Sequence, residues 1–149
     1  MNRALRYLLL VTLFASAALP AQLAAQSASS PDSIQGAMRS ALRALASAQL
    51  WHYETHKTYS ADVDSLKQAP GCVVPEGVIV GIKFADGAKG WAMESRHPDV
   101  PGQSCVYWNG TKGDVPEITT DEKQLRGSDR PGRVLCDFDA SAIPLGPSQ

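Results

Sequence analysis

The sequence predicts an α+β fold: a long N-terminal amphipathic helix packed on a three- to four-stranded antiparallel sheet. Three observations lead to this class. Apolar residues recur with the helical period over residues 32–57, three short runs rich in β-branched and aromatic residues follow over residues 78–108, and glycine and proline separate these runs. Because the helix precedes the strands and does not alternate with them, a parallel α/β sheet is not expected.

The first 25 residues differ in character from the rest of the chain. Two arginines precede an apolar run at residues 7–19, and small residues follow it, which is typical of a secretory signal peptide cleaved after Ala21 or Ala25. The run has 13 residues, whereas a membrane-spanning helix needs about 20. Residues 1–25 are therefore interpreted as a signal peptide. The mature chain is expected in the periplasm or outside the cell, with no stable membrane span.

The remaining 124 or so residues have the length of one domain. We expect a short linker at residues 26–31, the domain at 32–138 and a C-terminal tail at 139–149. The signal peptide contains two of the 14 basic residues and none of the 15 acidic ones, so its removal lowers the formal charge from -1 to -3. This acidic balance does not favour nucleic acid or anionic lipid as a partner.

The helix has clear sequence signals at its start and along its length. Ser30 is suited to the N-cap and Pro31 to the first turn. Seven apolar residues share one arc of the helix and are predicted to be buried: Ile34, Ala37, Met38, Ala41, Leu42, Leu45 and Ala48. The chain has no further proline through Lys57, so the helix should extend for about 25 residues, or roughly 37 Å.

The segment after Tyr59 is predicted to turn and then to form strands. Ser60 is a candidate cap for a short helical turn that ends at Leu66. A meander of three strands is expected at residues 78–84, 91–96 and 104–108, followed by an irregular loop at 109–133 and a last strand at 134–138.

Several of these segments resemble the globular part of bacterial type IV pilin-like and pseudopilin-like proteins. MRSALRALASAQ (38–49) and KTYSADVDSL (57–66) resemble the end of that family's amphipathic helix and the turn after it. GWAMESRHP (90–98) and SCVYWNG (104–110) resemble its second and third strands, and Cys136 resembles its terminal cysteine. The resemblance covers about 100 residues. It implies the same α+β fold and a role through protein contacts.

The sequence departs from that family at its beginning. Pilins and pseudopilins have a prepilin leader followed by an apolar helix half with an early glutamate, which builds the filament, whereas the apolar run here has no acidic residue and stops at Pro20. The resemblance therefore implies an exported, non-enzymatic structural or interaction protein without cofactors, an accessory of a type IV pilus or a type II secretion system with protein partners from those systems. Two alternatives stay open: a periplasmic metal- or ligand-binding protein, and an atypical filament subunit.

Three cysteines lie beyond the signal peptide, at positions 72, 105 and 136. An exported chain meets an oxidising environment, so one disulfide is expected and one cysteine is left over. The resemblance implies that Cys105 pairs with Cys136, which makes Cys72 an unpaired or intermolecular thiol. The sequence by itself also allows Cys72 to pair with Cys105.

Two histidines, His52 and His56, lie four residues apart near the end of the predicted helix. Their helical angles place both on the continuation of the buried stripe, and in the resemblance His52 occupies the place of an aromatic residue. A zinc or copper site would need a third ligand, and Tyr53 occupies the glutamate position of the HExxH motif. The sequence therefore favours a packing role for the pair over a metal site.

No motif of an enzyme is present. The chain has three histidines and no nucleophile elbow, so a catalytic triad is not expected. Four carboxylates in the late loop lack the ordered spacing of a calcium-binding loop and are interpreted as a solvated surface: Asp114, Glu117, Asp121 and Glu122. Trp51, Trp91 and Trp108 are predicted to pack in the core.

Overall fold

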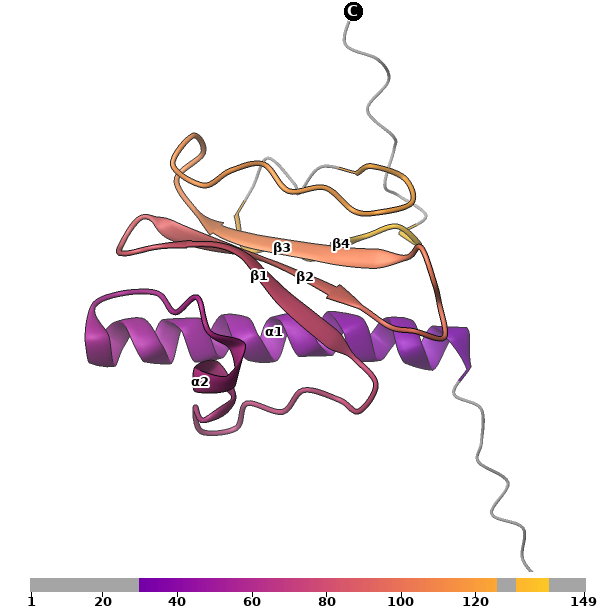
Figure 1. Cartoon of the computed structure of the whole chain (residues 1–149), viewed down its shortest axis with the longest axis horizontal. Coiled ribbons are helices and arrows are strands. Elements are labelled where there is room, and N and C mark those ends of the chain that lie inside the picture. The colour runs from indigo at the N-terminus through magenta and orange to yellow at the C-terminus, as the bar shows by residue number, and fades with distance from the viewer. Residues whose placement is uncertain (1–29, 126–130, 140–149) are drawn as a thin grey trace, which may run out of the picture.

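The computed structural model describes residues 30–125 and 131–139 of the chain. One helix packs against one face of a four-stranded antiparallel sheet, and an irregular loop crosses the opposite face (Figure 1). This arrangement confirms the α+β class. The helix begins at residue 31, so it is the first described element without lying at the chain's N-terminus. The proposed signal peptide and most of the proposed tail fall outside the described residues.

The helix α1 spans Pro31–His56, 26 residues. Its start is as predicted: the Ser30 side chain accepts a hydrogen bond from the Ser33 N–H, and Pro31 occupies the first turn. The helix ends at Lys57, whose backbone is left-handed, with φ of 61°, and whose N–H donates to the carbonyl of Tyr53 at 2.8 Å. Such a left-handed residue is a common way to end an α-helix.

The apolar stripe of α1 faces the sheet, as its period predicted. The side chains of Met38, Leu42 and Leu45 are fully buried, and Ser95 of the sheet donates to the carbonyl of Met38 at 3.1 Å. The stripe stops before the end of the helix. His52 is half-buried and His56 is exposed, so the prediction that both histidines continue the buried stripe is wrong.

The reason lies in what covers the last turns of α1. The returning chain at residues 58–60, not the sheet, lies against them: Gln49 is fully buried and binds both backbone groups of Ser60, donating to its carbonyl at 2.7 Å and accepting from its N–H at 2.9 Å. The rings of Tyr53 and Tyr59 stack with their centres 4.7 Å apart. This narrow cover leaves the rest of the helix end open to solvent.

Replacing Gln49 with alanine is expected to lower the free energy of unfolding by about 2 kcal/mol, because it leaves the buried N–H and carbonyl of Ser60 without partners. Urea denaturation of the purified protein measures the change. Ser47→Ala, on the exposed side of the same helix, should change stability by less than about 0.5 kcal/mol. Equal effects of the two substitutions would contradict the role given to Gln49.

The short helix α2, Val63–Lys67, begins differently from the prediction. Its N-cap is Asp62, whose carboxylate accepts from the N–H groups of Asp64 and Ser65. The Ser65 hydroxyl also donates to this carboxylate, and these bonds hold the pKa of Asp62 below its ordinary value. Ser60 lies two residues before this N-cap. Its hydroxyl accepts from the N–H of Asp62 at 3.0 Å and does not bind an N–H group of the helix.

The sheet has the order β1-β2-β3-β4, and all neighbouring pairs are antiparallel. The strands are β1 Ile79–Asp86, β2 Gly90–Arg96, β3 Ser104–Gly110 and β4 Leu135–Cys136. The first three agree with the predicted meander to within two residues at each end. The last strand has two residues where five were predicted. After it, the carboxylate of Asp137 accepts from the N–H of Ser104 in β3, and the carboxylate of Asp139 accepts from the N–H of Cys136.

The two faces of the sheet differ in what covers them. Trp91 and Met93 of β2 face α1 and belong to the main core, whereas Ala92 and Trp108 face the other side, where Val115 of the late loop packs on them. Figure 1 shows this loop passing over the side of the sheet away from α1. Trp91 and Trp108 are thus buried as predicted.

Candidate functional site

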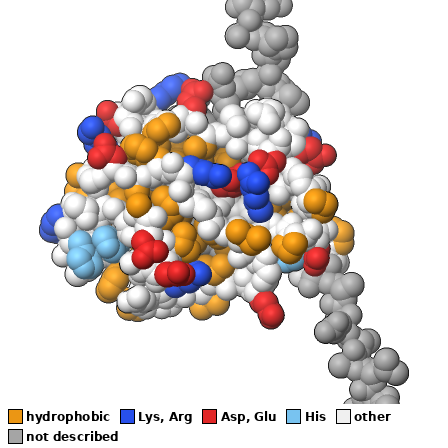
Figure 2. Space-filling model, in the orientation of Figure 1, with side chains coloured by type: hydrophobic (Ala, Val, Ile, Leu, Met, Phe, Trp, Pro, Cys, Tyr) orange, Lys and Arg blue, Asp and Glu red, His pale blue; other side chains and the backbone are white. Residues whose placement is uncertain are grey.

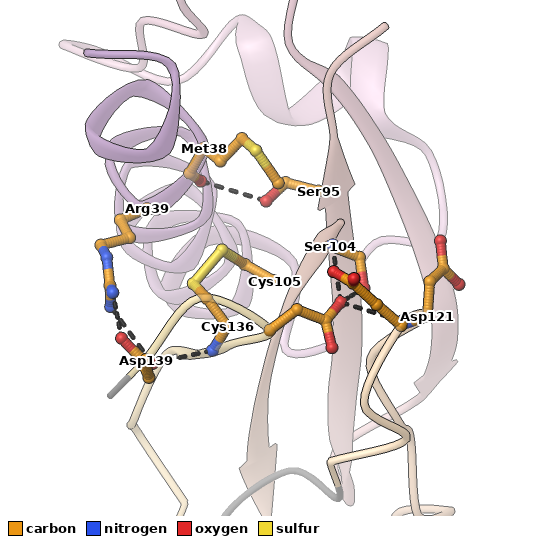
Figure 3. Close-up of a disulfide and its surroundings, with 10 residues drawn as sticks. Met38, Arg39, Ser95, Ser104, Cys105, Asp121, Cys136 and Asp139 are labelled. Carbon is orange, nitrogen blue, oxygen red and sulfur yellow. Dashed lines mark hydrogen bonds and ion pairs between the residues drawn. A yellow bond between two sulfur atoms is a disulfide. The ribbon is translucent and has the colours of Figure 1, made fainter. Parts of the chain in front are cut away.

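A disulfide joins Cys105 of β3 to Cys136 of β4, directly across the strand pair (Figure 3). This is the pairing that the resemblance implied, and the alternative between Cys72 and Cys105 is not formed. Both half-cystines are fully buried. The disulfide fixes the end of the described chain to the sheet. The irregular loop lies between the two cysteines in sequence, so the disulfide closes a covalent ring that contains it.

The residues after the disulfide also bind α1. The carboxylate of Asp139 pairs with the guanidinium of Arg39 in α1 and accepts from the N–H of Cys136 at 2.9 Å (Figure 3). The Arg39 guanidinium lies 4.9 Å from the ring centre of Phe138, a cation–π distance. Asp139, the first residue of the predicted tail, therefore contacts the fold.

Asp137 is a buried carboxylate that connects three segments. It accepts from the N–H groups of Ser104 at 2.9 Å, Glu122 at 3.2 Å and Lys123 at 2.8 Å. Burial by itself would raise its pKa, but hydrogen bonds, first among them the one from the Thr120 hydroxyl, hold the pKa below its ordinary value. Asp137 thereby fixes the late loop to β3.

A small pocket of about 190 Å³ lies on the face of the sheet away from α1. At its base, the buried Glu94 accepts from Lys83 at 2.7 Å on one oxygen and from Arg96 at 2.8 Å on the other, and Arg96 also binds Asp121 at 2.7 Å. The hydrogen bond that Arg96 donates to Glu94 raises the pKa of Arg96, and burial raises the pKa of Asp121. The two basic and two acidic groups neutralise one another.

Sequence reasoning did not find this charged pocket. The sequence pattern predicts that Asp121 is part of a solvated acidic surface, whereas in the structure its carboxylate binds Arg96. Across residues 30–125 and 131–139, no group of three or more histidine, cysteine, aspartate or glutamate side chains is arranged to hold a metal ion.

Cys72, the remaining cysteine, lies in the loop before β1 and is half-buried. Its thiol is free, as predicted for the unpaired cysteine, and burial raises its pKa. A raised pKa keeps the group as a thiol, which is less nucleophilic than the thiolate.

The histidine pair lies at the C-terminal end of α1. The two imidazole rings stack with their centres 4.2 Å apart and their planes at 25°. The Nδ1 atom of His52 lies 2.8 Å from the carbonyl oxygen of Thr58, and that of His56 lies 3.1 Å from the carbonyl oxygen of His52. In Figure 2 the histidine atoms at this end of the molecule lie together and open to solvent.

Two large apolar side chains in the last turns of α1, the part of the helix that also holds the histidine pair, are exposed. Leu50 retains 52% of its accessible surface and Trp51 retains 39%, so the prediction that Trp51 belongs to the core is wrong. Earlier residues on the solvent side of α1, such as Ser40, Arg43 and Ser47, are polar. We call Leu50, Trp51, His52 and His56 the α1 end surface.

Comparisons with protein-family models, with curated proteins and with solved structures found no match. Among the helices that the structure describes, none combines the length and apolar character needed to cross a membrane.

Proposed function

We propose that this chain is an exported, non-enzymatic, pilin-like interaction protein, an accessory of a type IV pilus or a type II secretion system. The proposal is supported by the signal-peptide pattern, by the order of helix and strands on which the resemblance depends, and by a disulfide at the position of the family's terminal cysteine. Its site of action is the periplasm or the cell exterior.

The observation that carries the contact role is the exposure of Trp51 beside Leu50 on the α1 end surface. The other two tryptophans are buried in the core and retain at most 7% of their accessible surface. Trp51 therefore differs from them in that its side chain is open to solvent. Tryptophan is enriched among the residues that dominate binding energy at protein interfaces. An exposed tryptophan next to a leucine is therefore a natural centre for a protein contact.

A non-enzymatic role agrees with the chemistry of the charged pocket. Its carboxylates are bound to Lys83 and Arg96, and a general base needs a lone pair directed at substrate. Because these charged groups pair with one another, we expect them to stabilise the sheet and not to act on a substrate.

Site-specific photo-crosslinking in cells that export the protein tests the contact role. A photoreactive residue at position 51 is expected to form an adduct with a pilus or secretion-system protein, and Leu50→Asp should weaken that adduct. The same probe at Ser40, exposed on the same helix, is the matched control and should form none. Equal adducts at both positions, or none at position 51, would contradict the proposal.

A further inference from the structure

We propose that His52 and His56 form a two-histidine binding site for a divalent transition-metal ion, Cu²⁺, Ni²⁺ or Zn²⁺. The site lies on the α1 end surface, but it is a second activity that does not depend on the proposed protein contacts.

The hydrogen bonds of the two rings decide which nitrogen is available. Each Nδ1 lies within hydrogen-bond distance of a backbone carbonyl oxygen, and a carbonyl oxygen only accepts. Each Nδ1 must therefore carry the hydrogen, which leaves the lone pair of each neutral ring on Nε2. Proteins commonly fix a metal-binding histidine in this way, with one ring N–H bound to a backbone carbonyl.

The two histidines can reach one shared ion once their rings leave the stacked arrangement. Residues four apart lie on the same side of a helix, but in the structure the rings stack with their centres 4.2 Å apart and their planes at 25°, so one ring must rotate before both Nε2 lone pairs point at the same ion. A zinc–nitrogen distance of about 2.0–2.1 Å requires the two ligating nitrogens to be roughly 3–4 Å apart. Because His56 is exposed, its ring can turn without disturbing the core, although the turn releases the contact between its Nδ1 and the carbonyl oxygen of His52.

The surroundings favour a cation with nitrogen ligands. The pair lies in the last turns of α1, where the helix dipole is negative. Imidazole suits Cu²⁺, Ni²⁺ and Zn²⁺, with Cu²⁺ bound most tightly, whereas Mg²⁺ and Ca²⁺ require oxygen ligands. Zinc sites in proteins usually have three or four protein ligands, and among the described residues no third histidine, cysteine or carboxylate joins this pair. The proposed site is therefore an open one in which water completes the coordination.

Zinc titration of the purified exported protein tests the site, with imidazole ¹H–¹⁵N resonances as the readout. Cys72→Ser is used as the background so that the free thiol does not take the ion. Before metal is added, His52 and His56 should both show hydrogen on Nδ1. One equivalent of Zn²⁺ should shift both Nε2 resonances to saturation, and Cu²⁺ should displace it. His97, whose Nδ1 accepts from the Asp99 N–H, is the internal reference and should not shift.

A matched pair of variants separates a shared site from general binding. His56→Phe keeps a stacking ring without a ligand and should weaken zinc binding at least about tenfold, since the second imidazole binds intramolecularly. His97→Gln should leave binding unchanged, and far-UV circular dichroism verifies that both variants are folded. Hydrogen on Nε2 in the free protein, no saturable shift, an equal shift of His97, or unaltered binding by His56→Phe would each overturn the proposal.

Discussion

Removing the disulfide by the double substitution Cys105→Ala and Cys136→Ala should lower the free energy of unfolding by about 3–4 kcal/mol. The two cysteines are 31 residues apart in sequence, and the chain-entropy model gives this value for a closed loop of about that length. Alanine suits both positions because they are fully buried. Urea denaturation of the oxidised wild type, the reduced wild type and the double variant measures the effect.

The double variant and the reduced wild type should agree, because both lose the same constraint on the unfolded chain. Cys72→Ala is the matched control: it removes a half-buried thiol that makes no disulfide, and should change stability by less than about 1 kcal/mol. If the double variant and the oxidised wild type unfolded with the same urea midpoint, the disulfide would not stabilise the domain.

Asp137→Asn is expected to lower the free energy of unfolding by about 3 kcal/mol at pH 7. The carboxylate accepts from three backbone N–H groups, and hydrogen bonds to a charged group contribute about 1.5–3 kcal/mol each. The amide of asparagine presents hydrogens to some of these donors and leaves them unpaired. Asp114→Asn, an exposed position in the late loop, is the control and should stay within about 0.5 kcal/mol of wild type.

The effect of Asp137→Asn should depend on pH. The folded-state pKa of Asp137 is lowered, so its contribution is fully present above the unfolded-state pKa of about 3.9 and is lost as the pH falls through the lower folded-state value. The difference between wild type and variant should therefore shrink as the pH falls from about 5 to 2. A difference that stays constant over this range would contradict the role of the ionised carboxylate.

Local sequence signals predicted α1 well. Its start depends on Ser30 and Pro31, and its buried face on the helical period, and both signals lie within the helix itself. The error at His56 arises because helical angle shows which residues share a face but not how far the covering elements extend. Trp51 was predicted to be buried because it is a tryptophan, although its helical angle places it near the exposed Ser40 and Ser47. Here the cover over the last turns is the narrow segment held by Gln49.

The charged pocket could not be predicted because it depends on strand register. Glu94 and Arg96 share one face of β2, but Lys83 reaches them only through the pairing of β1 with β2, which contains an irregularity between Ile82 and Phe84. Asp121 reaches the pocket from a loop without a sequence period. One disulfide, in contrast, was expected because the chain is interpreted as exported, and its pairing was expected from a family resemblance and not from the spacing of the cysteines.

The mass of the mature protein is the most direct test of the claim that this chain works as an exported domain without a filament-forming helix. Intact-mass spectrometry of protein isolated from producing cells should show a chain that starts at Gln22 or Gln26. A mass that retains the apolar run at residues 7–19 would contradict the claim and would favour an anchored filament subunit.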